Sequence, residues 1–183
     1  SAPAVRAVAE ALPFPDGSFA AGMAIFTVHH WSDPAAGLLE LRRVVRGRVA
    51  VLTWDASVFD EYWMVAEYVP ASRSLDTDVP GPAEIARMLG GGQVRPVPVP
   101  ADCSDGFYAA WWGRPEAYLD PEVRAAISGL ARLTPADVEP GIERLRQDLA
   151  DGTWQRRHGD LLNLEEFDAG YRLVVSGPSR GGG

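Results

Sequence analysis

The chain has 183 residues, 46% hydrophobic and 23% charged, which indicates a globular protein with one sizeable core. Its net charge is −8 and all seventeen basic residues are arginine, which argues against broad binding to nucleic-acid phosphates. No apolar run approaches the roughly 20 residues that span a bilayer, and the single Cys103 excludes an internal disulfide. We therefore expect a cytoplasmic protein that binds a small molecule, without a nucleic-acid or membrane partner.

The first part of the chain predicts a loop between two strands. Residues 3–8 suggest a short strand, and the nearly unbroken apolar run of residues 20–28 predicts a strand covered on both faces. The loop between them is marked by turn-forming residues, namely Pro13, Pro15, Asp16 and Gly17.

A capped helix follows. Asp33 can act as the N-cap and Pro34 suits the first helical position, so the helix begins here and ends near Gly47. Its apolar face is expected to hold Leu38, Leu41 and Val45. A second buried strand then spans residues 48–54. This strand–helix–strand order predicts an α/β sheet whose ligand crevice lies beyond the carboxyl ends of the parallel strands.

The remainder of the chain predicts helices, an edge strand and an inner strand. A short helix and a loop are expected in 56–80, and an amphipathic helix in 82–89, stopped by three glycines. Alternate prolines place 93–100 at a sheet edge, whereas 171–175 suits the sheet interior. The expected organisation is one domain over 1–176, with a helical insertion at about 104–162 and a flexible tail over 177–183.

An ordered set of motifs in the first third of the chain resembles class I S-adenosylmethionine-dependent methyltransferases that act on small molecules, the methyltransferase type 11-like group. The segment AEALPFPDGSF of residues 9–19 matches the family's A-E-x-L-P-F-x-D-x-S-F. A strand, a His-His-Trp exit and an E-x-x-R-V sequence at Glu40, Arg43 and Val44 follow in the family's order. The resemblance implies a Rossmann-like sheet with an antiparallel last strand.

The same resemblance implies the positions of the cofactor, S-adenosylmethionine, and of the site residues. The adenine would lie beside Ala9, Glu10, Ala11 and Leu12, and the methionine portion beside Phe26, Thr27 and His30. His30 is the candidate catalytic base; adjacent residues of an extended chain point in opposite directions, so we expect at most one of His29 and His30 to face the cleft. Aromatic and acidic residues after the strands are the candidate substrate contacts: Trp31, Trp54, Asp55 and Trp63.

The chain also departs from the family pattern. The G-x-G-x-G loop and the acidic residue that binds the ribose are absent from this sequence, and Val8 and Ala20 stand where the family usually has aspartates. The chain begins, without methionine, where the family's third strand would stand, so we expect a fragment of a longer protein whose N-terminal strands are missing. An isolated half-sheet would expose a strand edge, which predicts self-association as a homo-oligomer or poor order at the N-terminus.

Several features carry less functional information. Trp111 and Trp112 suit a pocket or a core equally well, and His158, beside two arginines, suggests a helix-end cluster. No metal-ligand pattern is visible, and the absence of G-x-S-x-G excludes an α/β hydrolase. Two functions remain open: methyl transfer to a small molecule, with this chain supplying the substrate side of the cleft, or a non-catalytic module with the same fold that binds a ligand or partner.

Overall fold

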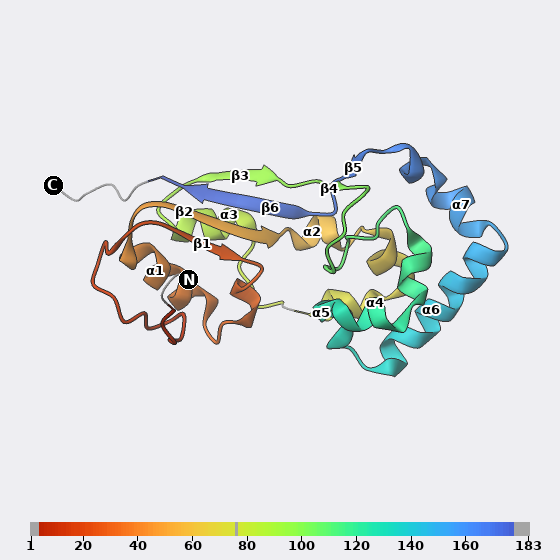
Figure 1. Cartoon of the computed structure of the whole chain (residues 1–183), viewed down its shortest axis with the longest axis horizontal. Coiled ribbons are helices and arrows are strands. Elements are labelled where there is room, and N and C mark those ends of the chain that lie inside the picture. Colours follow the sequence, from red (N-terminus) through yellow and green to blue (C-terminus); the bar gives the residue numbers. More distant parts are fainter. Residues whose placement is uncertain (1–3, 76, 178–183) are drawn as a thin grey trace. The chain divides into compact units, whose positions relative to one another are not determined.

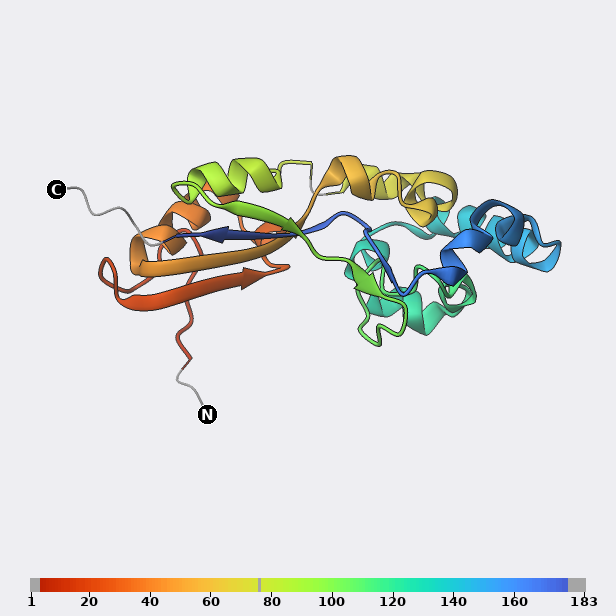
Figure 2. The same ribbon diagram turned by 90° about the horizontal axis from the view of Figure 1, so that it is seen from above.

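The computed structural model describes residues 4–75 and 77–177 and divides the chain into two compact units (Figures 1 and 2). Unit 1 comprises the described residues of Ser1–Asp55, Asp78–Pro96 and Tyr171–Gly183, and unit 2 comprises those of Ala56–Thr77 and Val97–Gly170. The expected helical insertion at 104–162 lies within unit 2. The prediction of a single domain over 1–176 stays a prediction, and of the expected tail only Gly177 lies within the described residues.

Unit 1 contains a four-stranded mixed sheet of order β1-β2-β6-β3. Its strands are β1 (Phe19–Ile25), β2 (Val45–Trp54), β3 (Gln93–Pro96) and β6 (Tyr171–Ser176). β1 and β2 are parallel, whereas β6 runs antiparallel to both β2 and β3. The expected inner position of the last strand and its antiparallel direction are therefore confirmed, and so is the Rossmann-like fold class.

One core cluster joins the sheet of unit 1 to α1 (Pro34–Val44) and α3 (Pro82–Met88). The strands contribute alternate residues such as Val49, Val51 and Val174, and the helices contribute Leu38 and Ile85, all fully buried. The two helices lie on the same side of the sheet (Figure 2). Alternate side chains on strands point to opposite faces, so the second face carries a different set of residues.

That second face of the unit 1 sheet, which we call the open face, is apolar. It carries Met23 and Ile25 of β1, with exposed fractions of 74% and 44%, beside the half-buried Leu52 and Leu173. The expectation that the first strand is covered on both faces is therefore wrong. An unbroken apolar run is typical of a fully covered strand, but β1 is an edge strand that meets the core through Ala24 and leaves alternate residues exposed.

Local chemistry sets the helix ends as expected. Asp33 caps α1, since its Oδ1 accepts from the backbone N–H of Ala36 at 3.0 Å, and Pro34 occupies the first turn. After α3, Gly90 and Gly91 have φ values of 83° and 103°, and their N–H groups donate to the carbonyls of Arg87 and Ala86. This is the Schellman pattern of a glycine helix stop.

Three other boundaries differ from the sequence expectations. Residues 4–8 form no strand, only an isolated bridge between Val8 and Ala11. α1 ends at Val44, and Gly47 lies inside β2, where the pairing shifts by one residue because the backbone of Ala20 approaches closely. The proline-rich strand is divided: Gln93–Pro96 forms the edge of the unit 1 sheet, whereas Val99–Pro100 (β4) pairs with Glu166–Phe167 (β5) in unit 2.

Unit 2 is mainly helical, as expected. Its first segment holds α2 (Ala56–Phe59), a π-helical turn η2 (Met64–Tyr68) and a 3₁₀ turn η3 (Pro70–Ser74). Its second segment holds η4 (Pro115–Leu119), α4 (Pro121–Ala126), α5 (Ser128–Ala131), α6 (Pro135–Ala150), α7 (Thr153–His158) and η5 (Gly159–Asn163). Within the described ranges, no helix is both long enough and apolar enough to cross a membrane.

The core of unit 2 is aromatic and internally hydrogen-bonded. The buried hydroxyls of Tyr62 and Tyr118 lie 2.8 Å apart, and Tyr118 donates to the carbonyl of Tyr108 at 2.6 Å. The hydroxyl of Tyr108 in turn lies 2.6 Å from that of Ser72, and burial raises the pKa of Tyr108. Because these hydroxyl groups find partners inside the core, their hydrogen bonds offset the cost of removing them from water.

Candidate active site

The backbone at the end of β1 turns sharply. Phe26 has a φ of 47°, in the left-handed region that residues other than glycine rarely adopt. Its N–H donates to the carbonyl of Leu52 at 3.1 Å, and its ring packs edge-on against Tyr171 with centroids 5.2 Å apart. Such strain persists only where neighbouring contacts over-determine it, and it is common at binding sites. Of the two residues predicted here, Phe26 is half-buried and Thr27 is exposed.

The two histidines lie together at the strand exits. Residues Val28–His30 form a 3₁₀ turn (η1), and the rings of His29 and His30 have centroids 3.9 Å apart. His29 also packs edge-on against Trp54 at 5.1 Å, so the end of β1 meets the end of β2. The expectation that the two histidines point in opposite directions is wrong, because it assumed an extended chain where the structure has a helical turn.

The other predicted substrate residues have different surroundings. Trp31 is half-buried and packs on α1, where a Cβ added to Gly37 would lie 2.4 Å from its ring. Asp55 is half-buried directly after β2. Trp63 is buried in unit 2, where its Nε1 donates to the carbonyl of Trp112 at 3.0 Å. Packing accounts for the positions of Trp31 and Trp63, and their contact with a substrate stays a prediction.

Trp111, Trp112 and His158 all belong to unit 2. Trp112 is buried and donates from Nε1 to the carbonyl of Val99 at 2.9 Å, whereas Trp111 lies under the guanidinium of Arg114. His158 is the last residue of α7, which confirms the expected helix-end position.

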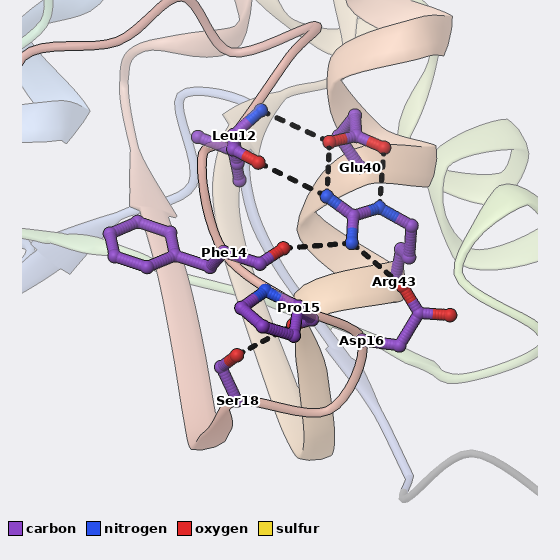
Figure 3. A network of polar contacts seen from close by, with 7 residues as sticks. All are labelled: Leu12, Phe14, Pro15, Asp16, Ser18, Glu40 and Arg43. Atoms are coloured by element: carbon purple, nitrogen blue, oxygen red, sulfur yellow. Dashed lines mark hydrogen bonds and ion pairs between the residues drawn. The ribbon is translucent and has the colours of Figure 1, made fainter.

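The loop before β1 is fastened to α1 by Arg43, as Figure 3 shows. The guanidinium donates from Nη2 to the carbonyl of Leu12 at 3.1 Å and from Nη1 to that of Phe14 at 2.9 Å. Nη1 also lies 2.7 Å from Oδ1 of Asp16. Glu40 accepts from Nε of Arg43 at 2.7 Å and, through Oε2, from the N–H of Leu12 at 3.0 Å. We call this group of residues the Arg43 anchor.

Charge and hydrogen bonding favour the ionised form of the Arg43 anchor. The hydrogen bond from Arg43, followed by that from the N–H of Leu12, lowers the pKa of Glu40 to about 2. The two carboxylates of Glu40 and Asp16 raise the pKa of Arg43. A second contact holds the same loop, since Oε1 of Glu10 accepts from the N–H of Asp33 at 2.9 Å and this bond lowers the pKa of Glu10. The E-x-x-R-V motif places Glu40 and Arg43 three residues apart, one turn of a helix, but their contacts with the loop are not evident from the sequence.

Sequence and structure comparisons identify relatives of the chain. Residues 2–52 match the family described as a methyltransferase domain. A crystal structure from Anabaena variabilis, named as a methyltransferase from an antibiotic biosynthesis pathway, is 34% identical with a TM-score of 0.83; the match covers 92% of this chain and 70% of that protein. The chain belongs to the class I S-adenosylmethionine-dependent methyltransferases.

A further solved structure matches this methyltransferase at lower similarity. The YcgJ protein from Bacillus subtilis is 22% identical, with a TM-score of 0.47, over 95% of this chain and 69% of that protein. No curated protein matches the chain.

The residues at the loop and the strand exits fit part of the family's cofactor. Ala11 is exposed and Ala9 half-exposed, so two small apolar side chains could pack against a flat ring. At the exit of β1, Thr27 and the exposed His30 offer a hydroxyl and an imidazole. Within residues 4–75 and 77–177, no cluster of three or more His, Cys, Asp or Glu side chains could hold a metal ion.

Proposed function

We propose that this chain supplies the substrate side of the cleft in an S-adenosylmethionine-dependent transfer of a methyl group to a small molecule. The observation that carries the proposal is the meeting of the β1 and β2 exits, where His29 contacts both His30 and Trp54. In open α/β sheets, ligands bind beyond the carboxyl ends of parallel strands. Membership of the family indicates the class of reaction, methyl transfer, and the strand exits provide the residues that we propose take part in it.

Each element of the proposed site has a separate role. Ala9 and Ala11 pack against the adenine, with Glu10 and Leu12 in the same segment; Phe26, Thr27 and His30 flank the methionine portion. Trp31, Trp54 and Asp55, all in unit 1, remain the proposed substrate contacts. When bound, S-adenosylmethionine supplies an electrophilic methyl group, and alignment of the nucleophile with it can lower the barrier by several kcal/mol.

His30 is the proposed general base. An imidazole close to the nucleophile can accept the proton of a substrate hydroxyl as the methyl group is transferred. The side chain is exposed at the exit of β1, and the neighbouring ring of His29 restricts its orientation. A cytoplasmic location agrees with the proposed small-molecule substrate and with the single free cysteine.

Calorimetric titration with S-adenosylhomocysteine tests the proposal. G-x-G-x-G is absent from this sequence, so we expect weak or no binding by the 183-residue chain and micromolar binding by the same chain extended N-terminally with a glycine-rich β-α-β segment of the family. If neither form binds, the proposal fails and the alternative, a non-catalytic module that binds another ligand or a partner, is favoured.

A further inference from the structure

All five N–H groups of the Arg43 guanidinium have an acceptor. Nε and one N–H of Nη2 donate to the two oxygens of Glu40, at 2.7 and 2.8 Å. The second N–H of Nη2 donates to the carbonyl of Leu12, and Nη1 donates to the carbonyl of Phe14 and to Asp16. A planar fork with five donors is a property of arginine alone, because a lysine has three donors on one atom.

The loop depends on these contacts for its conformation. Pro13 and Pro15 have no N–H, so this stretch cannot join a strand ladder through those residues. Leu12 is held at both backbone groups, its N–H by Glu40 and its carbonyl by Arg43. Arg43 of α1 therefore contacts the loop at three alternate residues, namely Leu12, Phe14 and Asp16 (Figure 3).

In the segment expected beside the adenine, residues bonded to α1 or to its N-cap alternate with alanines, of which Ala11 donates its N–H to the carbonyl of Val8 just before the segment. Glu10 is tied to the N-terminus of α1 through Asp33, and Leu12 is tied to its C-terminal half through the Arg43 anchor. Between and before these two anchored positions lie Ala11 and Ala9, which keep small, accessible side chains. The bonds at Glu10 and Leu12 thus fix the backbone of the segment, and the small apolar side chains of Ala9 and Ala11 stay accessible.

We propose that Arg43, held by Glu40, is a positioning residue for cofactor binding: it fixes residues 9–12 so that Ala9 and Ala11 can pack against the adenine. This inference rests on the proposed function. Arg43 does not itself contact the cofactor. It acts through Leu12, so its loss releases the segment without removing any residue of the binding surface.

Two substitutions in the same region test the proposal. Arg43→Lys keeps the charge but loses the fork. Arg46→Lys is the matched control, because Arg46 contacts the same loop only through the carbonyl of Gly17, at 3.1 Å. Hydrogen exchange of the Leu12 amide is measured in the 183-residue chain, with the amides of Val49 and Val51 in β2 as internal references.

We expect Arg43→Lys to lose protection at Leu12 while β2 stays protected, and Arg46→Lys to resemble the wild type. The affinity is measured in whichever protein binds S-adenosylhomocysteine, the 183-residue chain or its N-terminally extended version. There, Arg43→Lys should weaken binding roughly tenfold to a hundredfold, the effect expected when a binding segment is misplaced. Unchanged protection of Leu12, or lost protection with unchanged affinity, overturns the proposal. If the wild type does not bind S-adenosylhomocysteine, the proposed function fails, and Leu12 exchange still decides whether Arg43 holds the loop.

Discussion

Replacing Gly47 with alanine tests the close approach of β1 and β2. A Cβ on Gly47 would lie 1.8 Å from the carbonyl oxygen of Ala20 and 3.0 Å from its carbonyl carbon. Both are backbone atoms of the neighbouring strand, so no side-chain rotation can relieve the clash. The pairing shifts by one residue at this point, from Phe19 opposite Val45 to Ala21 opposite Arg48.

The expected loss of stability follows from that geometry. Overpacking costs about 1–3 kcal/mol, and a clash with backbone atoms places this substitution near 3 kcal/mol. Alanine restricts the unfolded chain more than glycine does, which offsets only about 0.4–1 kcal/mol. The net loss is then about 2–2.6 kcal/mol, and for a protein of this size the melting temperature should fall by roughly 4–10 °C.

Urea unfolding followed by far-ultraviolet circular dichroism measures the effect. Gly159→Ala is the control, because no atom lies within 4 Å of its added Cβ and its φ of −58° and ψ of −28° suit alanine. We expect the control to be unchanged or up to about 1 kcal/mol more stable. A Gly47→Ala protein that unfolds at the wild-type urea concentration would refute the argument that the strands need a glycine here.

Three further predictions concern unit 2, the open face and the Arg43 anchor. Gly141→Ala in α6 should cost about 1–3 kcal/mol in calorimetric unfolding, since its Cβ would lie 1.8 Å from the carbonyl oxygen of Tyr68; an unchanged transition would contradict this packing. Met23→Glu should reduce self-association of the chain in sedimentation velocity, because it charges the open face; equal association would show that the open face is not involved. The Glu40 carboxylate has a pKa of about 2 against an ordinary 4.5, so its contribution to stability is complete above about pH 4.5 and is lost as the pH falls toward 2. Urea midpoints measured over this range should fall less steeply for Glu40→Gln than for the wild type, and parallel curves would exclude the effect.

Signals within a few residues of one another allowed reliable predictions. The Asp33-Pro34 pair fixes the start of α1, and the glycines after Leu89 fix the end of α3. Both act through backbone groups of the same turn, so these two predictions need no distant contact. The inner position of β6 was also predictable, because an apolar strand without proline suits a place between two others.

Features set by distant contacts were not predictable from the same patterns. The apolar run that forms β1 is compatible with one covered face or two, and only the sheet order decides between them. Arg43 appears in the sequence as a helical partner of Glu40, whereas its bonds to Leu12 and Phe14 depend on how the loop folds back. The core of unit 2 likewise joins Tyr62 to Tyr118, which periodicity cannot pair.

The order of the strands in the sheet affects how the chain can fold while it is being synthesised. β6 leaves the ribosome after β1, β2 and β3, yet it lies between β2 and β3 and pairs Val174 with both Val51 and Val94. Until residues 171–176 emerge, β3 has no strand beside it and β2 has one open edge, while the whole of unit 2 has already been made. Contacts so distant in sequence slow folding. We expect unit 2 to acquire structure first, and a nascent chain stalled before Tyr171 to hold β3 unpaired and one edge of β2 open, both available to chaperones and to other chains.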